Sequence, residues 1–263
     1  MNAEPSPPPL AALVEFVRSQ QSSCADCAPG QQHAVDFVFA YQPIVDVGDG
    51  TVFAHEALVR GRDGAGAATV LAQVSAGNRF QFDQACRVEA IRQASALGIA
   101  QRLSINFLAN AVREAGQCIR ATLVAANMHG LAPERIMFEV QDRGDQAARV
   151  HAGAILQRYR ELGFLTALDR YHSASPADAL ALYAPDIVKL DIALVRGIEH
   201  DPARRRTVAA IMARCDAAHA QVIAVGVESV RERDALRALG IDLMQGNLFC
   251  PPALRALGKV PVW

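Results

Sequence analysis

Short runs of β-branched and aromatic residues alternate with longer amphipathic stretches from residue 37 onward. Runs of the first kind are typical of strands, and apolar positions spaced three and four residues apart are typical of helices. The pattern predicts strands at 37–46, 51–60, 103–107, 136–141, 164–169, 187–191, 221–227 and 243–249. It predicts helices at 82–98, 145–163, 203–220 and 229–240. The chain is therefore expected to be built from repeated strand–helix units.

The connection between the first two predicted strands is too short to hold a helix. It consists of residues 47–50, with the sequence VGDG, so these two strands should pair antiparallel as a hairpin. Eight strands, with helices between most of the later ones, predict an α/β fold, a TIM-like (β/α)8 barrel with an antiparallel first strand. An open, doubly wound sheet is the alternative. It is disfavoured because no glycine-rich phosphate loop follows an early strand.

The first 35 residues differ from the rest of the chain and are interpreted as an N-terminal extension, with the barrel domain at 36–263. Four prolines within residues 5–9 exclude regular structure there, and residues 10–17 could form a short helix. Cys24 and Cys27 have the CxxC spacing of half a zinc site, and His33 follows. Because no second pair completes the site, an ordinary loop is the alternative.

Composition narrows the class of protein without identifying a function. The 263 residues are 51% hydrophobic, which excludes a disordered chain, and 26 Lys+Arg balance 27 Asp+Glu, which argues against nucleic-acid binding. No stretch has the length and apolarity of a membrane span, and the N-terminus lacks the features of a secretory signal. Six cysteines are too few for a disulfide scaffold. We therefore expect a cytoplasmic globular protein.

Polar residues lie near the carboxyl ends of seven predicted strands. Functional residues of a TIM-type barrel occupy these ends, and carboxylates within apolar strands are costly unless they are paired or bind a metal. The residues are Glu56, Asn106, Glu139, Asp169, Lys189 with Asp191, Glu228 and Gln245. Glu56, Asn106, Glu139 and Asp169 form an acid-rich, all-oxygen set, which hard divalent cations such as Mg²⁺ or Mn²⁺ prefer. These four residues are the predicted metal ligands.

Several motifs in one order now resemble a known family. EALVR at 56–60, preceded by YQPIVD at 41–46, is similar to the opening signature of the EAL domain, the bacterial cyclic-di-GMP phosphodiesterase family. The similarity continues through SINF, FEVQD, TALD, VKLD, GVES and GIDLMQGNLF, and covers residues 37 to about 252. The resemblance implies a TIM-like barrel with an antiparallel first strand. It also implies a cyclic-di-GMP site at the barrel mouth, where two metal ions activate water in active members.

The resemblance also assigns roles to individual positions. Lys189 and Glu228 match catalytic positions, and Glu56, Asn106, Glu139 and Asp169 match the first metal site. The positions expected to contact the ligand are Gln42, Glu56, Arg60, Asp191 and Gln245. Arg60 would hold a phosphate with its planar guanidinium group.

Two substitutions depart from the family pattern. Arg170 replaces the second aspartate of the family's DDFG, a ligand of the second metal, and Val225 replaces the first glutamate of AEGVE. The following loop, HSASPAD, is one residue shorter and lacks its glycines, and Asp142 replaces a glutamate that holds it. The site thereby gains three positive charges relative to the pattern, and each like-charge contact at ~4 Å costs several kcal/mol. We expect the second metal to be lost, with one Mg²⁺ or Mn²⁺ at most.

Three functions remain open at this point. The first is a catalytically degenerate EAL protein that acts by binding cyclic-di-GMP, a protein partner, or both, with a homodimer as a further option. The second is an active phosphodiesterase that yields the linear dinucleotide, and the third is a nucleotide-independent interaction regulator. For the remaining acids we expect Arg170, rather than a metal, to fold inward as the counter-charge, because a tethered guanidinium is always charged.

Overall fold

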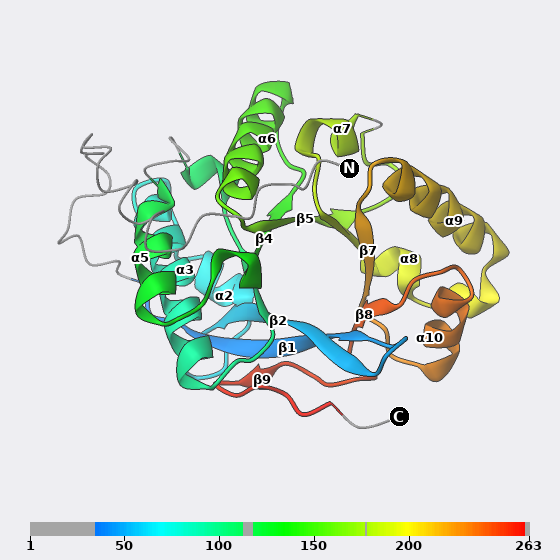
Figure 1. Ribbon diagram of the computed structural model, residues 1–263, viewed down its shortest axis with the longest axis horizontal. Helices are drawn as coiled ribbons and strands as arrows, with labels where there is room; N and C mark the ends of the chain where they lie inside the picture. Colours follow the sequence, from blue (N-terminus) through cyan, green and yellow to red (C-terminus); the bar gives the residue numbers. More distant parts are fainter. Residues whose placement is uncertain (1–34, 113–117, 177, 261–263) are drawn as a thin grey trace, which may run out of the picture.

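Figure 1 shows a ring of strands surrounded by helices in the computed structural model, which describes residues 35–112, 118–176 and 178–260. The sheet order is β2-β3-β4-β5-β6-β7-β8-β1-β9, and the additional β1–β2 pairing closes strands β1 to β8 into a barrel. The strands are β1 Val38–Asp46, β2 Thr51–Arg60, β3 Arg102–Asn106, β4 Ile136–Gln141, β5 Leu165–Tyr171, β6 Ile187–Leu190, β7 Gln221–Val225, β8 Leu243–Gln245 and β9 Ala253–Leu254. The predicted barrel is confirmed.

Helices follow most of the strands and cover the outside of the barrel (Figure 1). The α-helices are α2 Ala67–Leu71, α3 Arg79–Ala96, α5 Arg120–Met128, α6 Gln146–Glu161, α7 Ala179–Tyr183, α8 Ile192–Val195, α9 Pro202–Ala217 and α10 Val230–Arg237. Short 3-10 helices are η2 Ala109–Ala111, η3 Pro133–Arg135 and η4 Ile198–His200. The four predicted helices correspond to α3, α6, α9 and α10. The remaining helices and strand β9 were not among the predictions.

The first two strands form the predicted hairpin. Strands β1 and β2 pair antiparallel, whereas β2 to β8 pair parallel, so β1 closes the barrel between β8 and β2. The last two barrel strands are shorter than predicted. Strand β7 ends at Val225 because Gly226 has a φ of 84°, and the amide groups of Gly226 and Val227 instead donate to the carbonyl oxygen of Gln245.

Two apolar layers hold the barrel together. The outer layer lies between the strands and the helices, where the rings of Phe138 and Tyr159 pack with centroids 4.9 Å apart. The inner layer fills the barrel with one side chain from each of seven strands: Ile44, Ala54, Met137, Ala167, Ile187, Ile223 and Leu243. All seven are buried, so this layer is a packed plug and not a channel.

The inner layer decides where the polar strand residues point. Successive side chains of a strand alternate between its two faces, so a residue two positions further along faces the same side. The residues two positions after members of the inner layer are Glu56, Glu139, Asp169, Lys189, Val225 and Gln245. These six residues form the next layer inside the barrel, which we call the mouth layer. The end of the barrel beyond this layer, at the carboxyl ends of the parallel strands, is the mouth, and its exposed edge is the rim.

The structure tests the predictions for most of the cysteines but not those for the N-terminal extension. Cys86, Cys118 and Cys215 are free and buried, whereas Cys250, which was also expected in the core, is free and only half-buried. The predicted short helix at 10–17 and the CxxC loop with Cys24 and Cys27 lie outside the described residues. Among the described residues, no helix has both the length and the apolarity needed to cross a membrane.

Candidate nucleotide site at the barrel mouth

A buried lysine lies between two buried carboxylates at the centre of the mouth. The Nζ atom of Lys189, at the end of β6, donates to Glu56 Oε2 at 2.8 Å and to Glu139 Oε1 and Oε2 at 2.8 and 2.7 Å. Exposures are 2% for Lys189, 6% for Glu56 and 1% for Glu139. A burial this deep is sustained by the pairing, because a single buried charge would lose far more hydration energy than it regains.

Amide and hydroxyl groups complete the acid–lysine cluster, which we define as Glu56, Glu139, Lys189 and Gln245. Asn106 Nδ2 and Gln245 Nε2 donate to the two oxygens of Glu56 at 2.8 and 2.9 Å. The hydroxyl group of Ser104 donates to Glu139. Ser104 was not among the predicted site residues, although its place in SINF, two residues before Asn106, puts both on one face of β3.

The charges of the cluster are strongly coupled. Burial disfavours the anion of Glu56, but Lys189 and the amide donors outweigh burial and hold the pKa of Glu56 below its usual range. Burial, reinforced by the neighbouring Glu56 charge, raises the pKa of Glu139 to about 8. Burial disfavours the ammonium of Lys189, yet the attraction of Glu139 and Glu56 prevails and raises its pKa. Lys189 is therefore the permanent cation of the cluster.

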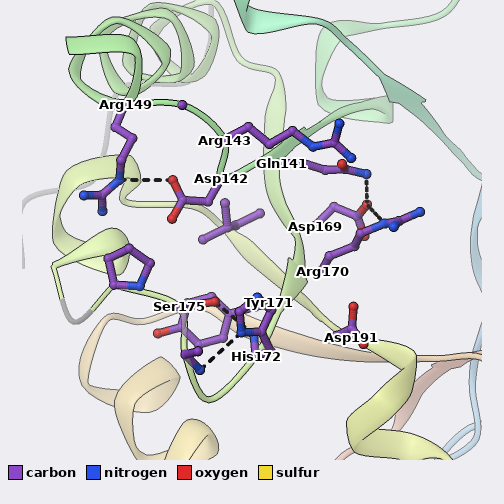
Figure 2. A pocket seen from close by; sticks show the side chains of 14 residues that line it. Gln141, Asp142, Arg143, Arg149, Asp169, Arg170, Tyr171, His172, Ser175 and Asp191 are labelled. Atoms are coloured by element: carbon purple, nitrogen blue, oxygen red, sulfur yellow. Dashed lines mark hydrogen bonds and ion pairs between the residues drawn. The ribbon is translucent and has the colours of Figure 1, made fainter. Parts of the chain in front are cut away.

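Strand β5 carries an acid, Asp169, and a guanidinium group, that of Arg170, at the rim of the mouth. Asp169 accepts a hydrogen bond from Gln141 Nε2 at 3.0 Å, and Arg170 Nε lies 3.8 Å from the same Asp169 oxygen (Figure 2). The β5–β6 ladder is irregular between Leu168 and Tyr171. The side chain of Arg170 is 65% exposed, so it does not fold inward as expected. Lys189, and not Arg170, supplies the counter-charge inside the acid cluster.

Gln42 and Arg60 lie on the β1–β2 hairpin and bond to backbone groups. Gln42 sits opposite Glu56 in the hairpin register, and its Nε2 atom donates to the Cys250 carbonyl at 3.1 Å. Arg60, half-buried at the end of β2, donates from Nη1 to the Val59 carbonyl at 2.8 Å. These bonds leave other donors of the Arg60 guanidinium group available, and ligand contact by both residues stays a prediction.

Strands β6 and β7 place their predicted residues differently. Asp191 begins α8, and its Oδ1 atom accepts from the Ala193 amide at 2.8 Å. Val225 is half-buried and packs against the inner apolar layer. Glu228 lies beyond β7, is about half exposed and forms an ion pair with Arg196. The hydrogen bonds found among the described residues do not join Glu228 to the acid–lysine cluster, and its catalytic role stays a prediction.

A cavity of about 480 Å³ opens between the segments that follow β4 and β5, and Asp169 of the mouth layer is among its lining residues (Figure 2). It is lined by Gln141–Gly144, Arg149, Leu168–His172, Ala174–Pro176 and Asp191. Asp142 fixes its wall by accepting from Arg149 Nε at 3.0 Å and from the Tyr183 hydroxyl at 2.7 Å. These two bonds join Asp142 to helices α6 and α7.

The donor set at the mouth has the chemistry of a site for a hard cation, but its arrangement does not. Carboxylate oxygens of Glu56, Glu139 and Asp169 suit Mg²⁺ or Mn²⁺. However, Lys189 lies between two of these acids, and Asn106 presents its amide nitrogen to Glu56. Within the part of the chain that the structure describes, no group of three or more His, Cys, Asp or Glu side chains is placed to hold a metal. In this arrangement Glu56 and Glu139 bind the ammonium group of Lys189.

A family comparison agrees with this architecture. The EAL domain model matches residues 28–252 of the chain. The chain belongs to the EAL domain family. A curated relative, the blue light- and temperature-regulated antirepressor BluF of Escherichia coli, is 26% identical over 84% of this chain. The matched part spans 56% of BluF, so the chain covers little more than half of that relative's length.

Two solved structures share the fold and contain the nucleotide. A standalone versatile EAL protein from Vibrio cholerae, in its c-di-GMP-bound form, has a TM-score of 0.82 and 39% identity and covers 88% of this chain and 98% of its own. Klebsiella pneumoniae BlrP1 with manganese and cyclic-diGMP has a TM-score of 0.80 and 28% identity and covers 89% of this chain and 60% of its own. A further BlrP1 structure holds FMN and cyclic-diGMP without metal ions, with a TM-score of 0.71.

Proposed function

We propose that this EAL domain binds cyclic-di-GMP at the barrel mouth and does not hydrolyse it. The observation that carries the proposal is the guanidinium group of Arg170, 65% exposed at the mouth, where the family pattern has an aspartate that holds the second metal. Lys189 matches a lysine that active members share, so its pairing with Glu56 and Glu139 does not by itself distinguish binding from hydrolysis.

By the family resemblance, one ligand of the second metal and one nearby carboxylate are replaced in this chain. Arg170 stands where the family pattern has an aspartate, and Val225 packs on the inner apolar layer where the pattern has a glutamate. A divalent cation placed there would meet a guanidinium group and one fewer carboxylate. Loss of one preorganised electrostatic group costs an enzyme about 10²–10³ in rate, so loss of a metal should cost at least that.

Binding without metal is chemically reasonable for this fold. One BlrP1 structure carries cyclic-diGMP with no metal ions, and its fold matches this chain with a TM-score of 0.71. In this chain Gln42 and Arg60 remain at the mouth, and the buried Oε1 atom of Gln245 has no hydrogen-bond partner among the described residues. A polar ligand would supply that missing partner.

A protein partner is the second part of the proposal. The relative BluF is named an antirepressor. We infer that the nucleotide-bound domain acts on a protein partner. Formation of a homodimer and a cytoplasmic location stay predictions.

The test is to incubate the purified chain with cyclic-di-GMP in excess Mg²⁺ or Mn²⁺ and to separate the nucleotides by ion-exchange chromatography. We expect the cyclic dinucleotide to stay intact, while calorimetry detects its binding. Linear dinucleotide formed at a turnover near one per second, within the range of working enzymes, would establish the rival function of an active phosphodiesterase. Absence of binding, with a partner still captured, would favour the nucleotide-independent regulator.

A further inference from the structure

We propose that Arg143 and Arg170 together hold one phosphate group of the bound cyclic dinucleotide at the rim of the mouth. Both residues line the 480 Å³ cavity, Arg143 from the segment after β4 and Arg170 from β5. Figure 2 shows their side chains extending to the same side, with Gln141 and Asp169 beside them. The inference rests on the proposed binding of cyclic-di-GMP and specifies which residues would meet its charge.

These two guanidinium groups differ from the third arginine of the cavity. Arg149 is fully engaged, because it donates to Asp142 at 3.0 Å and to Asp178 at 2.9 Å. Arg143 is exposed and has no ion pair with any of the residues described. Arg170 has one loose ion pair, 3.8 Å from Asp169. Arg143 and Arg170 therefore keep most of their five donors free for a ligand.

The backbone of Arg170 gives an independent reason to assign it a role. Its φ is 56°, in the left-handed region that side chains other than those of glycine, asparagine and aspartate adopt at a cost. The β5–β6 ladder is irregular at this point, and the side chain of Arg170 is 65% exposed at the rim. Strained residues of this kind persist where the surrounding structure holds them, and they concentrate at binding sites.

The charge of the mouth identifies the ligand group. The carboxylates of the mouth outnumber Lys189, so a phosphodiester approaching the cluster would be repelled. Two guanidinium groups at the rim offset that excess of negative charge, and a guanidinium fork matches two phosphate oxygens. In this arrangement the arginine pair supplies the positive charge that a metal ion supplies elsewhere.

The experiment measures cyclic-di-GMP affinity by calorimetry in EDTA for the wild-type chain, Arg143→Gln, Arg170→Asn and the double variant. Asparagine is chosen at position 170 because it tolerates the left-handed backbone, so the variant keeps the fold while it removes the guanidinium group. Arg158→Gln is the matched control. It removes the same charge from α6, where Arg158 pairs with Glu161 at 2.8 Å outside the cavity.

We expect each rim variant to weaken binding about 10- to 100-fold, the scale of a charge-assisted hydrogen bond, and the control to change it by less than about twofold. The salt dependence of the affinity should also become shallower in the rim variants. Wild-type affinity in both single variants and in the double variant would overturn the arginine pair while leaving the proposed binding intact. A wild-type chain that does not bind the nucleotide would overturn both.

Discussion

The mouth of the barrel has two charged regions that look alike in the sequence and differ in the structure. The acid–lysine cluster is buried, and Lys189 joins Glu56 and Glu139 at 2.7 to 2.8 Å. The rim is open, and Arg170 stands 65% exposed with a loose contact to Asp169. The buried charges pair with one another and hold the barrel mouth together, whereas the exposed charges of the rim remain available for a ligand.

A substitution in the buried acid–lysine cluster should have the largest effect, and this effect is on the free energy of unfolding. Lys189→Met leaves Glu56 and Glu139 buried without their cation, so we expect a loss of about 3–5 kcal/mol in the free energy of unfolding. Chemical denaturation measures this loss. The matched control is Lys259→Met, which changes the other lysine of the chain, an exposed residue, and should cost almost nothing.

A second readout of Lys189→Met concerns metal. With the ammonium gone, Glu56, Glu139 and Asp169 are free to share a divalent cation, so Mn²⁺ should raise the melting temperature of the variant and leave that of the wild-type chain unchanged. Equal responses of the two proteins would show that Lys189 does not compete with a metal for these acids.

Restoring acids at the rim should give the next largest effect. Arg170→Asp combined with Val225→Glu removes a guanidinium group and adds one carboxylate at the rim and one in the mouth layer. We expect the double variant to bind Mn²⁺ and to gain about 10²-fold in hydrolysis of cyclic-di-GMP over the wild-type chain. The single variants should gain much less, because both groups would serve one metal-centred unit. A double variant without Mn²⁺ binding would refute the alignment of these positions with the family.

The pH dependence of stability tests the protonation state of Glu139 in the acid–lysine cluster. The pKa of Glu139 rises from an ordinary 4.5 to about 8, so the folded chain holds this proton more tightly than the unfolded chain. Its contribution is then fully present below about pH 4.5 and is lost as the pH rises through 8. Stability should fall over this window, and Glu139→Gln should flatten the fall.

The window from pH 6.5 to 8 is the cleanest part of that measurement. Burial lowers the pKa of His55 from 6.5 to about 4, and a histidine with a depressed pKa makes stability rise with pH below 6.5. Above pH 6.5 this contribution levels off, because the unfolded histidine loses its proton there. Denaturation of wild type and Glu139→Gln at pH 6.5 and 8 is the check, and parallel pH profiles would exclude Glu139 as the titrating group.

Relief of backbone strain at the rim should give the smallest effect. Arg170→Gly removes the cost of a φ of 56° and should raise stability by about 1 kcal/mol, while it weakens nucleotide binding. His219, also with a φ of 56°, lies at the end of α9, and His219→Gly should raise stability similarly without affecting binding. If Arg170→Gly lowers stability, the strain argument is wrong.

The sequence predicted the barrel because local patterns and strand–helix alternation agree throughout the chain. Strand β4 has the predicted bounds, 136–141, and the β1–β2 hairpin follows from a connection too short for a helix. Strand β8 was predicted too long because Gly246 follows Gln245 and packs against the Val227 backbone, where a Cβ would overlap. That contact between distant segments has no local sequence signal.

The residues of the site were predicted from the sequence, but the cation that pairs with the buried acids was not. Strand alternation brings Glu56, Glu139 and Gln245 into one layer, and this much follows from period two. The choice of Lys189 over Arg170 as the inner cation depends on which side chain reaches the cluster. The β5–β6 ladder is irregular between Leu168 and Tyr171, where Arg170 lies, and such irregularities are not visible in the residue pattern.

The central claim is that fixed cations of the chain have taken the place of metal in binding cyclic-di-GMP. The most direct measurement is the affinity for cyclic-di-GMP of one wild-type preparation in EDTA and again in excess Mn²⁺, with the nucleotide analysed after each titration. We expect affinities that agree within about twofold and a cyclic dinucleotide recovered intact, because the rim arginines need no metal. Binding that tightens more than about tenfold with Mn²⁺, or recovery of the linear product, would contradict it.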